Sequence, residues 1–176
     1  CKAWEALYGK GKCHLQNLII NPDNVVDEKI DRGLRNFFTE NAANSATFSD
    51  FFPQIEHNTI YRVSDVFLCR YIFFRLPTLE GKQLFVVGPY IITDVLPQQV
   101  LQQCEKLGIS PKFSGELSAF YASIPIIGDE NYIFSMITAF AERLWGGENS
   151  FLNVEIDKES TAAFILGGFE LKNTND

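Results

Sequence analysis

The stretch that decides the fold runs from residue 58 to residue 92 and reads NTIYRVSDVFLCRYIFFRLPTLEGKQLFVVGPYII. Between residues 66 and 76 almost every side chain is apolar or aromatic, and β-branched and aromatic types favour strands. Side chains of a strand alternate between its two faces, so both faces here are mostly apolar and both must be covered. Residues 66–76 are therefore predicted to form the central strand of a sheet.

Further strands flank this segment on both sides. Residues 59–63 approach it through the short polar pair Ser64-Asp65, and residues 83–92 follow a loop in which Gly81 can take a positive φ. Residues 14–20 alternate imperfectly and end at a cluster of turn-forming residues, which predicts a fourth strand. The expected core is an antiparallel meander, and residues 151–156 are a candidate for a last strand.

The periodicity changes from two to about 3.6 after the meander, as expected for helices. Pro97 suits a first helical position and Gly108 a stop, Ser110-Pro111 repeats the start signal, and Asp129 is placed to cap a third helix. These three consecutive helices can cover one face of the sheet, so the predicted class is α+β. Additional helices are predicted near residues 2–8 and 27–38, residues 44–54 are predicted to form a lid, and residues 160–166 fit either a helix or a strand.

Composition narrows the class of protein. A chain of 176 residues with 46% hydrophobic content can bury one core, and its net charge of −7 with scattered Lys and Arg argues against nucleic-acid binding by this chain alone. The four cysteines form no CxxC pair, which favours reduced thiols and a cytoplasmic protein. No charged-then-apolar leader and no apolar run of roughly 20 residues is present, so we expect no membrane partner.

Catalytic and metal-binding motifs are missing from the sequence. There is no GxSxG, HExxH or SxxK, the glycine pairs lack a phosphate-binding frame, and the His and Cys spacings match no zinc pattern. We therefore expect no enzyme, no metal and no cofactor. An enzyme remains the alternative if His57 meets a cysteine or a carboxylate at the base of a cleft.

Charged and hydroxyl-bearing side chains interrupt the apolar meander and are the candidate site. A charge on a covered sheet face needs a partner, so an arginine there either recognises a ligand carboxylate or phosphate, or forms an internal ion pair, for instance with Asp65, or reaches solvent. An internal ion pair or a head that reaches solvent is the favoured interpretation for the arginines, and core filling with a hydroxyl at the rim is favoured for the tyrosines. The candidate ligand-binding residues are Tyr61, Arg62, Arg70, Tyr71 and Tyr90.

Five short motifs occur along the chain in an order typical of a known kind of domain. They are Asp31-Arg32-Gly33-Leu34-Arg35, Ile60-Tyr61-Arg62-Val63, Val87-Gly88-Pro89-Tyr90, Phe120-Tyr121-Ala122-Ser123-Ile124-Pro125 and Ala141-Glu142-Arg143-Leu144-Trp145-Gly146. In this order of motifs the chain resembles, over residues 3–150, the N-terminal regulatory domains of a group of AraC/XylS-type bacterial transcriptional regulators. The resemblance assigns no role to any single residue.

The resemblance implies a sensor domain over residues 1–170 and a linker from residue 171 to residue 176. Beyond Asp176 it implies a helix-turn-helix region, through which alone the protein would bind DNA. The implied fold is a PAS- or GAF-like antiparallel sheet with helices packed on it, and the three successive helices argue against a cupin barrel. The implied partners are an unknown small-molecule effector and a second copy in a homodimer; the alternative is a ligand-free PAS/GAF-type interaction module of another signalling protein.

Overall fold

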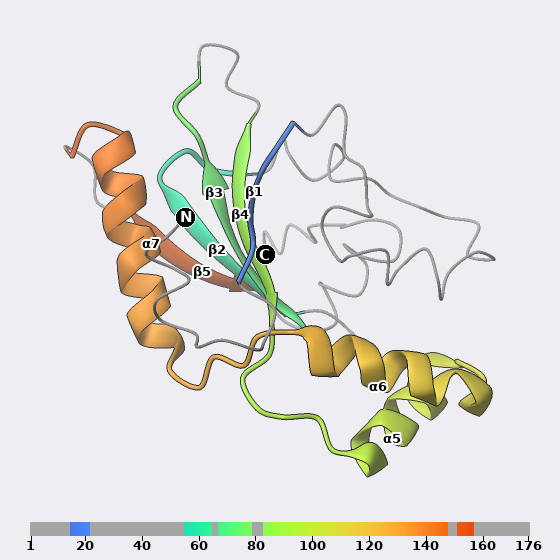
Figure 1. Ribbon diagram of the computed structural model, residues 1–176. Coiled ribbons are helices and arrows are strands. Elements are labelled where there is room, and N and C mark those ends of the chain that lie inside the picture. The colour runs from blue at the N-terminus through green and yellow to red at the C-terminus, as the bar shows by residue number, and fades with distance from the viewer. Residues whose placement is uncertain (1–14, 22–54, 65–66, 79–82, 148–150, 157–176) are drawn as a thin grey trace, which may run out of the picture.

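The computed structural model describes residues 15–21, 55–64, 67–78, 83–147 and 151–156 (Figure 1). The elements predicted near residues 2–8, 27–38 and 160–166 lie outside these residues, as do the lid predicted at 44–54 and the proposed linker at 171–176.

Five strands form one sheet in the order β1-β4-β3-β2-β5. Their bounds are Asn17–Ile20 for β1, Thr59–Ser64 for β2, Arg70–Arg75 for β3, Leu84–Tyr90 for β4 and Leu152–Ile156 for β5. The first four strands pair antiparallel, which confirms the predicted meander and its fourth strand. Strand β5 pairs parallel with β2, so the sheet is mixed and the expectation of a purely antiparallel sheet is wrong. The protein is α+β, as predicted.

Strand β3 is the middle strand, and residues 71–74 on both of its faces are buried. The prediction of a central strand covered on both sides is therefore confirmed. The strand begins at Arg70 rather than at residue 66, however. Leu68 has a φ of 64° and therefore lies in the left-handed region, where the extended path of a strand is interrupted.

Three helices follow the meander, as predicted. Their bounds are Pro97–Leu107 for α5, Ser114–Ser123 for α6 and Glu130–Leu144 for α7, and a 3₁₀ turn at Pro111–Phe113 precedes α6. The expectation that all three cover one face is wrong. Helix α7 packs through Ile133, Ile137 and Ala141 on the face that carries Ile72, whereas α5 and α6 join the cluster of Tyr71 on the other face, at one end of the sheet (Figure 1).

The predicted stops and buried cysteines agree with the structure in detail. Helix α5 starts at Pro97 and ends before Gly108, whose φ of 66° is the left-handed conformation that a glycine adopts at low cost. Cys69 and Cys104 are fully buried and form no disulfide, so both behave as small core side chains.

Asp129 caps α7 as the sequence predicts. Its Oδ1 accepts a hydrogen bond of 3.1 Å from the backbone N–H of Asn131, one of the donors that have no partner within the helix. We expect Asp129→Ala to lower the free energy of unfolding by about 1 kcal/mol, because that donor loses its acceptor. Urea denaturation measures the change, and Asp129→Asn, which keeps the accepting oxygen, should retain most of the stability.

Candidate functional site

Two arginines, a tyrosine and two glutamates meet where α7 begins, and we call them the Glu130 cluster. Nη1 of Arg70 lies 2.6 Å and Nη1 of Arg62 lies 3.3 Å from the same oxygen of Glu130, Oε2. The hydroxyl of Tyr90 donates to the other oxygen, Oε1, at 2.9 Å. Nη2 of Arg62 also donates to Glu155 on β5, at 2.5 Å. One carboxylate thus joins β2, β3 and β4 to the first residue of α7.

The sheet register explains why the arginines need an anion. Arg62 lies opposite Ile72 on β3, so Arg62, Arg70 and Ile72 share the face on which α7 packs. Arg62 and Arg70 are diagonal neighbours on that face, close enough for two positive charges to repel each other. The side chains are only 23% and 20% exposed, so water screens the repulsion poorly. Glu130 lies against both charges, and Glu155 supplies a second carboxylate to Arg62.

Tyr90 reaches the cluster because the register between β3 and β4 shifts. Ile72 pairs with Val87, but Arg70 pairs with Tyr90, so a step of two residues along β3 corresponds to a step of three residues along β4. This shift places Tyr90 on the face of Val87, to which simple alternation would not bring it. Gly88 lies at the shift, with a φ of 137° and a cis bond to Pro89.

Burial and charge set the protonation of two members. Burial raises the pKa of Tyr90 far above its ordinary value, and the charge of Glu130 and the hydrogen bond to it raise it further. For Arg62, burial lowers the pKa, but the hydrogen bond to Glu155 and the charges of Glu130 and Glu155 outweigh it, so the net pKa is raised. Tyr90 therefore remains a donor and Arg62 a cation.

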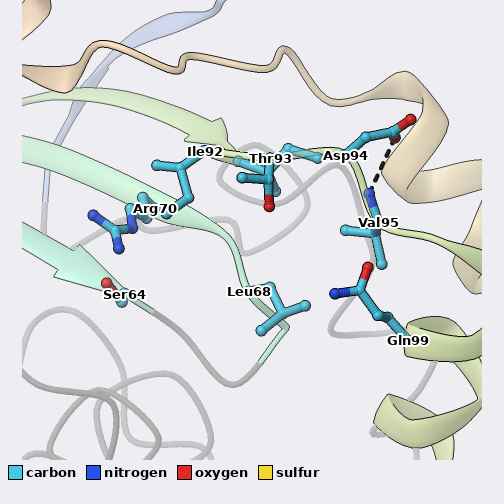
Figure 2. A pocket seen from close by; sticks show the side chains of 9 residues that line it. Ser64, Leu68, Arg70, Ile92, Thr93, Asp94, Val95 and Gln99 are labelled. Atoms are coloured by element: carbon cyan, nitrogen blue, oxygen red, sulfur yellow. Dashed lines mark hydrogen bonds between the residues drawn. The ribbon is translucent and has the colours of Figure 1, made fainter.

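A hollow of about 170 Å³ lies beside Arg70 (Figure 2). In Figure 2, Leu68, Thr93 and Gln99 face its centre, while the guanidinium of Arg70 points away from Gln99 and Val95. Two of its polar side chains have backbone partners, because Asp94 accepts from the N–H of Val95 and Gln99 from that of Leu96. Arg70 thus contributes mainly its stem to this hollow. The complete lining is Ser64, Leu68, Arg70, Ile91, Ile92, Thr93, Asp94, Val95 and Gln99.

A second hollow, of about 280 Å³, lies between α7 and β5, and we call it the α7–β5 hollow. A cation, two amides, an aromatic ring and a carboxylate border it, so it offers charged groups, neutral hydrogen-bonding groups and an apolar surface to a small ligand. The guanidinium carbon of Arg62 lies 5.7 Å from the centre of the Phe134 ring. Its lining is Arg62, Asn131, Phe134, Asn153, Val154 and Glu155.

Of the five candidate residues, the structure brings Arg62, Arg70 and Tyr90 together and places the other two on the opposite face. Tyr61 stacks on Phe73 with ring centres 5.2 Å apart, and its hydroxyl accepts from the N–H of Glu56 at 2.9 Å. Burial raises the pKa of Tyr61. Tyr71 is 5% exposed and belongs to the same core cluster as Tyr61.

The sequence indicated the cations of the cluster but not their partners. Asp65, the example of an ion-pair partner named above, lies outside the described residues. The partners that the structure shows are Glu130 and Glu155. The sequence did contain an indication for Glu130, because an acidic residue in the first turn of a helix interacts favourably with the helix dipole. Glu155 carried no comparable signal.

His57, on which the enzyme alternative depends, meets no cysteine or carboxylate among the described residues. His57 is exposed and lies 3.2 Å from Nη1 of Arg75 and beside the Trp145 ring, not against a cysteine or a carboxylate. Within the same part of the chain, no three His, Cys, Asp or Glu side chains could hold a metal ion, and no helix has the length and apolar character to cross a bilayer. Comparison of the chain with protein-family models, curated proteins and solved structures yields no match.

Proposed function

We propose that the chain is a non-enzymatic, cytoplasmic regulatory domain that binds a small-molecule effector and, as its resemblance to AraC/XylS-type regulators implies, controls a separate DNA-binding region. The observation that carries the proposal is the convergence of Arg62, Arg70 and Tyr90 on Glu130, with each arginine also lining a hollow. The PAS- or GAF-like sensor that the resemblance implies would bind its ligand between the sheet and its helices.

The Glu130 cluster supplies the differential contact that a switch requires. A ligand shifts an equilibrium only by its difference in affinity for the two states, and allosteric coupling is typically about 1–3 kcal/mol. One hydrogen bond to a charged group contributes about 1.5–3 kcal/mol. A ligand that exchanges a partner of Arg62 or Arg70 therefore alters how firmly α7 or β5 is held, by up to this amount at the buried Glu130 and by less than about 1 kcal/mol at the exposed Glu155.

A thermal-shift screen of metabolites tests the proposal. At a concentration about 100 times its Kd, an effector stabilises the native state by about 2.7 kcal/mol, which corresponds to a Tm increase of about 5–10 °C in a domain of this size. We expect at least one such compound, and we expect Arg62→Gln to reduce its effect. A library without any stabilising compound would contradict effector binding. The coding sequence after Asp176 is an independent test, since two helix-turn-helix patterns are expected there.

The second candidate is a ligand-free interaction or dimerisation module. The observation that favours it is the exposure of Leu152 and Val154, at 61% and 40%, on β5, which is an edge strand in the described part of the sheet. Exposed apolar side chains on an edge strand invite pairing with another chain. Analytical ultracentrifugation distinguishes this candidate, because a monomer at high micromolar concentration would exclude homodimerisation.

A further inference from the structure

We propose that the α7–β5 hollow binds a small monocarboxylate, and that the ligand's carboxylate takes the position of Glu155 on the guanidinium of Arg62. This inference rests on the proposed function and names the chemical class of the effector and its point of attachment. Glu155 is then an internal stand-in for the ligand, and binding exchanges one carboxylate for another.

Arg62 has donor capacity that its present partners do not use. Nη1 donates to Glu130 and Nη2 to Glu155, while Nε is buried and has no partner among the described residues. Nε and Nη2 lie on the same side of a guanidinium and together match the two oxygens of a carboxylate. Glu155 contacts only Nη2, with one oxygen. If the departure of Glu155 uncovers Nε, a carboxylate that spans Nε and Nη2 satisfies both donors.

The two glutamates differ in how readily they exchange. The side chain of Glu130 is 14% exposed and receives three donors, from Arg62, Arg70 and Tyr90. The side chain of Glu155 is 56% exposed, and within the described residues it forms an ion pair with Arg62 alone. An exposed ion pair contributes little net stability, whereas removal of a partner from a buried one is costly. Glu155 is therefore the carboxylate that a ligand displaces.

The charges around the hollow favour a monocarboxylate over a phosphate. Arg62 keeps its contact with Glu130, so the guanidinium has two carboxylate partners before and after the exchange, and a monocarboxylate adds a single negative charge to the site. A phosphate carries more negative charge and would face Glu130 and the displaced Glu155 at close range. Asn131 and Asn153 add amide groups for the rest of the ligand, and the Phe134 ring adds an apolar surface.

The exchange of carboxylates changes how β5 is attached to the sheet. This strand pairs only with β2 within the described sheet, and residues 152–155 are exposed, so few side-chain contacts hold it. The Arg62–Glu155 pair joins the two strands across their shared face. Loss of that pair on ligand binding leaves β5 attached to β2 mainly through backbone hydrogen bonds.

The test is a titration of the full chain with propionate, followed by NMR through the side-chain amides of Asn131 and Asn153. Propionamide is the uncharged match and inorganic phosphate the more highly charged competitor. We expect propionate to shift the signals of both amides, and propionamide and phosphate to bind at least about tenfold more weakly. Arg62→Lys loses the paired donors of the guanidinium and should weaken propionate binding about tenfold. Glu155→Gln should tighten propionate binding about twofold to fivefold, because the competing carboxylate is gone.

Glu105→Gln is the matched control, because it removes the same charge from an exposed position on α5 and should leave the affinity unchanged. Equal affinities in the wild type, Arg62→Lys and Glu155→Gln would overturn the inference, and so would unshifted Asn131 and Asn153 amides. A metabolite that stabilises the chain without shifting these amides would contradict the monocarboxylate site but would leave the proposed regulatory function standing. Propionate binding at Arg62 without helix-turn-helix patterns after Asp176 would support the site and contradict the regulatory function.

Discussion

Gly88→Ala is expected to lower the free energy of unfolding by about 2–4 kcal/mol, because a side chain at this position meets both strain and a clash. The φ of 137° is one that residues with a side chain rarely adopt. An added Cβ would lie 2.7 Å from the carbonyl oxygen of Arg70 and 3.0 Å from Cδ1 of Tyr71. Both neighbours belong to the buried central strand β3, so neither can move without disturbing the core. Urea denaturation measures the loss.

Gly115→Ala is the control for this substitution. Gly115 lies exposed in the first turn of α6, and an added Cβ meets nothing within 4 Å. Alanine there should stabilise the protein by up to about 0.5–1 kcal/mol, since glycine is the poorer helix former. If Gly88→Ala and Gly115→Ala left stability equally unchanged, the close approach of β4 to β3 at Gly88 would be contradicted.

The central strand was predictable because burial on both faces leaves a continuous apolar run in the sequence. Residues 71–74 of β3 show this run and are all buried. The start of the strand was not predictable, since Val66, Phe67 and Leu68 continue the apolar pattern while the backbone at Leu68 already turns. Local pattern identifies which residues are buried but not the φ at which a strand ends.

Pairings between distant segments were beyond the sequence pattern. The orientation of β5 depends on a crossover through α5, α6 and α7, and nothing within residues 151–156 distinguishes a parallel from an antiparallel partner. The division of the helices between two faces has the same origin, because periodicity finds an apolar stripe without showing which surface it meets.

The candidate site was predictable only in part, for a similar reason. Arg62 and Arg70 interrupt an apolar strand pattern, so their need for a partner is visible in the sequence. Glu130 lies 68 and 60 residues away from them, and its position depends on where α7 docks. Tyr90 was identified as a candidate, but its face follows from the register shift at Gly88, which alternation does not reveal.

Glu130→Gln is expected to lower the free energy of unfolding by about 2–3 kcal/mol. This loss is smaller than that from breaking a fully buried ion pair and larger than that from breaking an exposed one. The carboxylate accepts from Arg62 and Arg70 at one oxygen and from Tyr90 at the other. An amide has a single oxygen, so at least one of these donors must face an NH₂ group. Arg70 loses the carboxylate that it contacts, and Arg62 keeps only Glu155. Urea denaturation at low and at high salt measures the loss, which should persist at high salt because the cluster is partly buried.

Glu155→Gln is the matched comparison, because it makes the same chemical change on the same arginine at a 56% exposed carboxylate. We expect it to cost less than about 1 kcal/mol, and that small cost should vanish at high salt.

A second readout is specific to Glu130. Burial is the largest cause of the raised pKa of Tyr90 and remains in Glu130→Gln, but the charge of Glu130 and its acceptor are lost, so the pKa of Tyr90 should fall. An ultraviolet titration compared with Tyr90→Phe isolates this phenol. Equal small losses in both glutamine variants, with an unchanged Tyr90, would show that solvent rather than Glu130 compensates the arginines, and the proposed connection between sheet and α7 would fail.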